Sequence, residues 1–160
     1  MLHLVLVEPE IHWNTGNLGR TALAVGAELH LVEPLGFSLD DKQVKRAGLD
    51  YWPRVKLHTW PSWDAFARAL PALGEAWYFS ASATRPYWDA RFAGDTVLVF
   101  GRESVGLPRA LVAAAGDHAI TIPMADPGLR SLNLSTAGAL AAYEVMRQNV
   151  DRSRSRSGTP

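Results

Sequence analysis

Short, almost continuous apolar runs alternate with amphipathic stretches along this chain, and that alternation limits the possible folds more than any other feature. The runs that we expect to be strands are residues 2–7, 29–32, 55–58, 76–81, 96–100 and 119–122. Helical spacing of apolar residues predicts helices over 17–25, 63–70 and 134–147. Strands that are apolar on both faces and alternate with helices form parallel sheets. The sequence therefore predicts an α/β fold built on a parallel sheet.

The length and composition indicate one domain with an ordinary core. The chain has 160 residues, of which 48% are hydrophobic, and no internal repeat divides it. The composition changes only at the C-terminus, where residues 151–160 read DRSRSRSGTP and contain no apolar side chain. We expect residues 1–149 to form the domain and residues 150–160 a disordered basic tail. This tail either only improves solubility or makes a weak, salt-sensitive phosphate contact.

Several classes of protein are excluded by what the chain lacks. It has no cysteine, which excludes a disulfide scaffold, a thiolate zinc site and a cysteine nucleophile. No apolar run approaches the ~20 residues of a membrane span, and the N-terminus does not have the pattern of a signal peptide. We therefore expect a cytoplasmic protein. Basic and acidic residues balance at 16 each, which argues against nucleic-acid binding by bulk charge alone.

The common motifs of α/β enzymes are also missing. No G-x-G-x-x-G follows a predicted strand, no P-loop is present, and G-x-S-x-G does not occur. The five histidines are scattered without metal-ligand spacing, so we predict no metal site.

Three loops rich in Gly, Asn or Pro remain, and each follows a predicted strand. Parallel sheets bind ligands at this end of their strands. The first loop, residues 14–20, reads N-T-G-N-L-G-R. Asn14 or Thr15 could cap the following helix, and the guanidinium of Arg20 could hold an anion near the helix N-terminus.

The second and third loops have comparable features. In the second, residues 100–108, the missing side chain of Gly101 would let a ligand approach the backbone, and Glu103 could orient an arginine or pair with a cation. In the third, residues 120–135, Ser131 or Asn133 could cap the next helix. Taken singly, the glycines and capping residues of these loops could be ordinary turns and helix caps, but capping does not explain Arg20 in the first loop.

Taken in order, the three loops resemble the three motifs of the SPOUT superfamily of RNA methyltransferases. The matching patterns are N-x-G-N-x-x-R, F-G-x-E-x-x-G-L-P and I-P-M followed by S-x-N-L-S. Residues 1 to about 149 are similar to the small tRNA 2′-O-methyltransferases of the TrmL type.

The resemblance implies a deep trefoil knot near the C-terminus and a homodimer in which the last long helix, with Tyr143, is a dimer face. It implies S-adenosylmethionine as the methyl donor. The residues that the resemblance assigns to its binding are Ser80, Gly101, Ile122, Met124, Ser131, Leu132 and Asn133. Arg20 and Glu103 would be the catalytic residues.

A ribose hydroxyl is a poor nucleophile, so its developing charge must be accepted or stabilised. Arg20 matches the arginine that has been proposed as the base in this family, but arginine hardly loses its proton in proteins. We therefore expect Arg20 to stabilise the alkoxide or a phosphate, with Glu103 orienting it.

Substrate contacts are expected at Arg20 and on a short polar helix that starts at Asp40–Asp41 and runs to Ala47. This helix carries Lys42, Lys45 and Arg46, and the family match covers Lys42 and Arg46. Trp13 and Trp52 lie near the predicted site loops, where they could stack on bases or pack in the core or a dimer face.

The leading hypothesis is an S-adenosylmethionine-dependent 2′-O-methyltransferase that acts on the wobble nucleotide of certain tRNAs, a cytidine or a modified uridine. One alternative is the same chemistry at another tRNA position or on ribosomal RNA. A second alternative is a non-catalytic RNA-binding or scaffold dimer that keeps the fold. The sequence leaves open which tRNAs are methylated and whether a base must be modified first.

Overall fold

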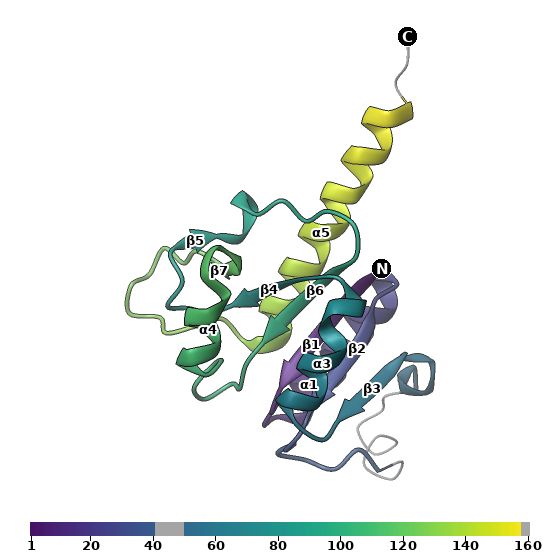
Figure 1. The fold of residues 1–160 in the computed structure, drawn as a ribbon. Helices are drawn as coiled ribbons and strands as arrows, with labels where there is room; N and C mark the ends of the chain where they lie inside the picture. The colour runs from purple at the N-terminus through teal and green to yellow at the C-terminus, as the bar shows by residue number, and fades with distance from the viewer. Residues whose placement is uncertain (41–49, 158–160) are drawn as a thin grey trace.

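The computed structural model describes residues 1–40 and 50–157 and contains a seven-stranded sheet in which every strand pair is parallel. Its strand order is β3-β2-β1-β6-β4-β7-β5. The strands are β1 (Leu2–Val7), β2 (Glu28–Val32), β3 (Leu57–Trp60), β4 (Glu75–Phe79), β5 (Arg85–Pro86), β6 (Thr96–Phe100) and β7 (Ala119–Thr121). The predicted parallel α/β fold is confirmed, and Figure 1 shows the sheet running through the middle of the molecule.

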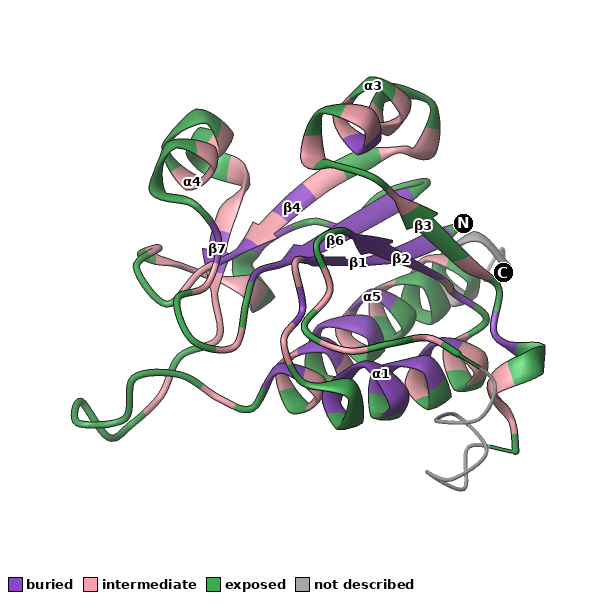
Figure 2. Cartoon of the chain, turned by 90° about the horizontal axis from the view of Figure 1, so that it is seen from below, coloured by how far each residue is buried: buried purple, intermediate pink, exposed green. Residues whose placement is uncertain are grey.

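Helices cover both faces of the sheet, as Figure 2 shows. One face carries α1 (His12–Val25) and α5 (Leu134–Ser157), and the other carries α3 (Trp63–Leu73) and α4 (Arg109–Ala115). Three short 3₁₀ turns complete the described elements: η1 (Trp52–Arg54), η2 (Tyr87–Asp89) and η3 (Gly116–His118). Helices α1 and α5 pack closely at Gly138. A Cβ atom at this position would lie 2.5 Å from Leu18, so a glycine is needed there.

The central strands are buried on both faces, which explains their near-continuous apolar sequence. In β1, Leu4 and Leu6 belong to the core under α1 and α5, while Val5 and Val7 belong to the core under α3. This division follows the alternation of side chains along a strand. The predicted strands 2–7 and 96–100 are confirmed without change.

Elsewhere the observed strands and helices differ from the predicted ones in their bounds, and one strand was not predicted. The strand predicted at 55–58 lies at Leu57–Trp60, because Val55 packs into the core beyond the end of η1. The very short β5 was not predicted, since two residues carry no periodic signal. The sequence pattern predicts a helix from residue 17, whereas α1 begins at His12 with Ile11 as its N-cap. The proposed capping role of Asn14 or Thr15 is therefore wrong, because both residues lie inside the helix.

Helix α5 continues to Ser157, although the composition predicts a disordered tail after residue 149. The extension is supported by local ion pairs, because Arg147 contacts Asp151 at 2.8 Å, one turn along. Arg152 also donates a hydrogen bond to the carbonyl of Phe92. The helix therefore has partners in this stretch that a reading of composition does not reveal. Figure 1 shows its end projecting away from the sheet.

The segment between β5 and β6 crosses α5 on its way into the sheet (Figure 1). Gln148 of α5 accepts from the backbone of Phe92 at 3.0 Å and donates to the carbonyl of Ala90 at 3.0 Å. Phe92 is fully buried in the core that α5 also covers. In residues 1–40 and 50–157, no helix combines the length and apolar character needed to cross a membrane.

Candidate active site

A cleft of about 580 Å³ opens at the carboxyl ends of β4, β6 and β7, within the usual size range of small-molecule sites. Its walls come from the segments that follow these strands and from the start of α1. All seven residues that the sequence assigns to the methyl donor line it: Ser80, Gly101, Ile122, Met124, Ser131, Leu132 and Asn133. Residues from three distant parts of the chain therefore meet around one cavity.

A chain of side-chain hydrogen bonds joins the three sequence motifs beside this cleft. The amide nitrogen of Asn14 donates to Glu103 Oε1 at 3.0 Å. The amide nitrogen of Asn133 donates to Asn14 Oδ1 at 2.9 Å. Asn14 is buried, so both bonds are shielded from water. The first, second and third motifs thus fix one another directly.

Glu103 holds the chain entering α1 rather than a basic side chain. Its two oxygens accept from the backbone N–H of Glu10 at 2.8 Å and of Ile11 at 3.2 Å, in addition to Asn14. All three partners are donors, which suits an ionised carboxylate because it only accepts. Glu103 therefore anchors the start of α1 from another loop, the role that the sequence analysis gave to local caps.

The loop after β6 is closed on itself and tied to the loop after β1. The backbones of Arg102 and Gly106 exchange hydrogen bonds at 3.2 and 2.8 Å. Ser104 donates to the Glu10 carboxylate through both its N–H and its hydroxyl, each at 2.9 Å. The side chain of Arg102 forms an ion pair with Glu8. This reciprocal pairing gives the cleft a fixed wall.

Gly101 has a different function from the one expected. A Cβ atom at this position would lie 2.1 Å from the carbonyl carbon of Gly106 and 2.2 Å from the nitrogen of Leu107. The missing side chain therefore makes room for the returning loop, and the predicted reason, close approach of a ligand, is not needed to explain it. Gly101 still lines the cleft.

Asn133 has the capping role predicted for it, at the start of α5. Its Oδ1 atom accepts from the backbone N–H groups of Ser135 and Thr136 at 2.9 and 3.3 Å. The side chain thus caps α5 with its oxygen and holds Asn14 with its nitrogen. The long loop before it, residues 122–133, keeps its backbone free of strands and helices along one wall of the cleft.

The lining of the cleft suits an adenosine derivative with a short aliphatic arm. Ile122, Met124 and Leu132 are only partly buried and offer apolar contacts. Ser80 lies at the end of β4 beside β7, where its N–H donates to the Ile120 carbonyl at 3.0 Å, and its hydroxyl is 2.8 Å from that of Ser82. The carboxylate of Glu103 accepts from three donors in α1 and just before it, so its hydrogen bonds are directed toward the start of α1. The described residues therefore fit S-adenosylmethionine.

Arg20 lies apart from the other predicted site residues. It is exposed on α1, about 9 Å of helix rise beyond Asn14, and does not belong to the lining of the cleft. Its guanidinium stacks over the ring of Tyr51, 4.9 Å from the centroid, and the Tyr51 hydroxyl donates to the Gly16 carbonyl at 2.7 Å. The expectation that Glu103 orients Arg20 is therefore wrong within the described chain. In this chain, Tyr51 is the residue that contacts the Arg20 guanidinium.

Lys42, Lys45 and Arg46 lie outside the described residues, together with the short helix predicted to carry them.

Sequence reasoning missed a group of histidines under α3. His3, Glu28 and His30 bring potential ligand atoms within 4.8 Å of one another. However, His30 Nδ1 accepts from the Trp60 indole at 3.1 Å, so its proton is on Nε2, which faces His3 Nδ1 at 3.0 Å. A metal bound at Nε2 would move the proton to Nδ1, which would then face the Trp60 N–H donor instead of accepting from it. Parallel pairing of neighbouring strands, which no motif encodes, brings these residues together.

Burial, with smaller effects of His58 and His3, lowers the pKa of His30 to about 3. We therefore describe His30 as a buried neutral side chain that is hydrogen-bonded to His3 and Trp60, and not as a metal ligand.

The parallel sheet and the cleft in which the three motifs meet are those expected from the resemblance to the SPOUT class of methyltransferases. Three comparisons with known proteins identify the family. The family model described as SpoU rRNA Methylase matches residues 1–143, and this chain belongs to that family.

Several relatives are similar over most of their length. The tRNA (cytidine(34)-2′-O)-methyltransferase of Acidovorax sp. strain JS42 is 44% identical, over 93% of each chain. That of Saccharophagus degradans is 43% identical, over 92% of this chain and 96% of its own.

Solved structures agree with this assignment. One structure, which concerns the 2-OH methylation of C/U34 on tRNA, is 49% identical with a TM-score of 0.87, over 95% of this chain and 98% of its own. The methyltransferase AviRb of Streptomyces viridochromogenes in complex with AdoMet is 25% identical with a TM-score of 0.79, over 94% of this chain and 58% of its own.

Proposed function

We propose that this protein is an S-adenosylmethionine-dependent tRNA 2′-O-methyltransferase that acts on the ribose of the wobble nucleotide, position 34. The observation that carries the proposal is the hydrogen-bonded junction of Asn14, Glu103 and Asn133 beside the cleft. It assembles all three motifs around one ligand-sized cavity. Relatives that are 43–44% identical over nearly their whole length carry this activity in their names.

The methyl donor is held by the residues that line the cleft: Ser80, Gly101, Ile122, Met124, Ser131, Leu132 and Asn133. When bound, S-adenosylmethionine supplies an electrophilic methyl group for transfer to an RNA hydroxyl. The apolar side chains of Ile122, Met124 and Leu132 exclude water from this region, and the loop backbone offers hydrogen-bonding groups. Glu103 and Asn133 keep these segments in place.

Arg20 supplies positive charge for the RNA. Arginine keeps its proton in proteins, so Arg20 stabilises a phosphate or the developing ribose alkoxide and does not act as a base. Tyr51 holds the guanidinium on the exposed side of α1. Because Arg20 lies outside the cleft of its own chain, it is available to a cleft on a second copy. Lys42 and Arg46 add contacts to tRNA in this proposal.

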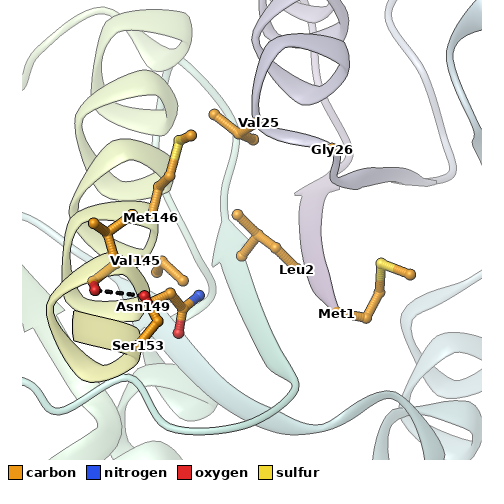
Figure 3. A pocket seen from close by; sticks show the side chains of 9 residues that line it. Met1, Leu2, Val25, Gly26, Val145, Met146, Asn149 and Ser153 are labelled. Atoms are coloured by element: carbon orange, nitrogen blue, oxygen red, sulfur yellow. Dashed lines mark hydrogen bonds between the residues drawn. The ribbon is translucent and has the colours of Figure 1, made fainter. Parts of the chain in front are cut away.

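The active form is a homodimer in this proposal. On α5 the large apolar side chains of Leu140, Tyr143, Met146 and Val150 are 41–52% exposed and recur at helical spacing. We call these four residues the α5 stripe. A hollow of about 370 Å³ beside the stripe is lined partly by Met146 and Val150, and Figure 3 shows Met146 extending toward Val25 of α1. A continuous exposed apolar strip of this kind is typical of a protein interface.

The knotted path implied by the family fold remains part of the proposal. The crossing of α5 by the segment that contains Ala90 and Phe92 supports it.

The dimer is tested by replacing Tyr143 with Asp and measuring mass by light scattering. The variant should be monomeric, whereas Trp88→Asp, an exposed aromatic outside the α5 stripe, should remain dimeric. A dimeric Tyr143→Asp would contradict this interface.

The activity is tested by incubating the protein with S-adenosylmethionine labelled in its methyl group and total tRNA, then digesting the tRNA to nucleosides. We expect label in 2′-O-methylated cytidine or uridine from the anticodon. Arg20→Ala should abolish transfer while calorimetry shows unchanged affinity for S-adenosylmethionine. Label only in ribosomal RNA, offered in parallel, would assign a different substrate. Binding of the methyl donor without transfer to either RNA would contradict the enzymatic proposal.

A further inference from the structure

One side of α1 is exposed and carries groups that suit an unpaired RNA strand. Trp13, Asn17 and Arg20 are exposed at positions i, i+4 and i+7, which places them on the same side of the helix. Trp13 is 54% exposed, a large fraction for an indole in the first turn of a helix. We call these three residues the α1 strip.

We propose that the α1 strip binds an unpaired segment of the RNA substrate and that Trp13 stacks on one of its bases. This inference rests on the proposed function, because it assigns a substrate contact to that same reaction. Protein aromatic side chains commonly recognise single-stranded RNA by stacking on bases that are splayed out of a loop.

The position of Trp13 supports this assignment. Asn14, the next residue, and Ile11, two residues earlier, both line the cleft, so Trp13 lies in the same short segment of chain as the cleft wall. The ring of His12 packs against it, with centroids 4.5 Å apart and planes inclined by 38°. His12 thereby limits the freedom of the indole on one side. An aromatic group held in one orientation loses less entropy when it stacks on a base.

The chemistry of the α1 strip favours RNA over a second protein copy. It combines an aromatic ring with an amide and a guanidinium, the groups that stack on bases, bind their edges and pair with phosphate. The α5 stripe has no charged member, which suits a protein interface better. The two exposed surfaces therefore differ in the partner they fit.

Distance along the helix indicates which nucleotide is stacked. Trp13 and Arg20 are separated by about 10 Å of helix rise, roughly three nucleotides of a stacked strand at ~3.4 Å each. If Arg20 contacts the ribose or phosphate of the methylated nucleotide, Trp13 reaches a base one to three positions away. Trp13 is then a substrate-positioning residue, and it should affect RNA binding more than the chemical step.

The test compares Trp13→Ala, Trp13→Phe and the matched control Trp88→Ala, whose indole is 53% exposed on η2. For Trp13→Ala we expect KM for tRNA to rise about tenfold, the order of one lost base stack, with kcat and affinity for S-adenosylmethionine unchanged. Trp13→Phe should recover most of this loss because it keeps an aromatic face. The control should behave as the wild type.

A binding measurement separates this inference from the proposed function. A single-stranded RNA with the anticodon-loop sequence should quench the tryptophan fluorescence of the wild type, and Trp13→Phe should lose most of that quenching. If the wild type methylates no RNA but this difference persists, the proposed function fails and the stacking contact stands. An unchanged KM with unchanged quenching in Trp13→Ala would overturn the inference. So would conversion of Trp13→Ala to a monomer, since Trp13 would then belong to a protein interface.

Discussion

The side-chain amide of Asn133 donates a hydrogen bond to the side-chain oxygen of Asn14, 2.9 Å away in space and 119 residues away in sequence. The amide nitrogen of Asn14 in turn donates a hydrogen bond to Glu103. The cleft therefore exists only when the beginning, middle and end of the chain are folded together. Binding of the methyl donor should in turn stabilise the whole domain, because a ligand of the folded state shifts the unfolding equilibrium.

Replacing Asn14 with Ala should disturb both the fold and the cleft. The change leaves the Asn133 amide without its acceptor and removes one of the three donors to Glu103. We expect the free energy of unfolding to fall by about 1–3 kcal/mol and the Kd for S-adenosylmethionine to rise. Urea unfolding and calorimetry measure the two effects. Thr21→Ala on the same helix, which loses only a bond to the Asn17 carbonyl, is the control and should change neither.

Glu103→Gln tests whether this residue anchors α1 or exchanges protons. All three hydrogen-bond partners of the carboxylate are donors, and glutamine would present an N–H₂ group to at least one of them. We expect the isosteric variant to lose about 1–3 kcal/mol of stability. Its remaining activity should keep the pH profile of the wild type. A variant of normal stability whose pH–rate profile loses a titration would instead assign Glu103 to proton transfer.

Sequence reasoning found the strand ends of the site but not the contacts between them. The apolar runs 2–7 and 96–100 predicted β1 and β6 because strands buried on both faces need continuous apolar sequence. The seven cleft residues followed from motif resemblance. The pairing of Glu103 with the start of α1 was not predicted, since local helix-capping rules look only at adjacent residues. The histidine cluster depended on strand register, which no single segment contains.

Gly101→Ala should be far more harmful than its chemistry suggests. The added Cβ would lie 2.1 Å from the backbone of Gly106, so the loop after β6 must move. We expect a loss of about 1–3 kcal/mol in stability together with loss of binding to S-adenosylmethionine. Gly26→Ala is the comparison, because its φ of +70° is unfavourable but its Cβ meets nothing within 4 Å. That variant should lose about 1 kcal/mol and bind normally. Equal binding by both variants would contradict the assigned role of Gly101.

Stability should decline in mild acid because His30 is buried in its neutral form. Burial lowers its pKa to about 3, while in the unfolded chain it titrates at its ordinary value of 6.5. Between these values the unfolded state binds more protons, so the free energy of unfolding falls as the pH is lowered, at about 1.4 kcal/mol per pH unit. Urea unfolding at several pH values between 4 and 8 measures this slope.

The control for the acid effect is His30→Gln, which keeps an acceptor for Trp60 and a donor for His3 but cannot titrate. The slope of its unfolding free energy against pH should be smaller than that of the wild type by about 1.4 kcal/mol per pH unit, the effect of one proton. The pKa of His3 is also lowered, chiefly by burial, so some dependence on pH should remain. Identical slopes in the two proteins would show that His30 is not the group responsible.

The most direct measurement uses two tRNA substrates that differ only in the 2′-hydroxyl of nucleotide 34. Both are offered to the wild-type protein with labelled S-adenosylmethionine, and incorporation of label is followed over time. The account predicts transfer to the tRNA that has the hydroxyl and none to the tRNA with a 2′-deoxy nucleotide at that position. Equal labelling of the two tRNAs would contradict it, because the methyl group would then be going to a different atom.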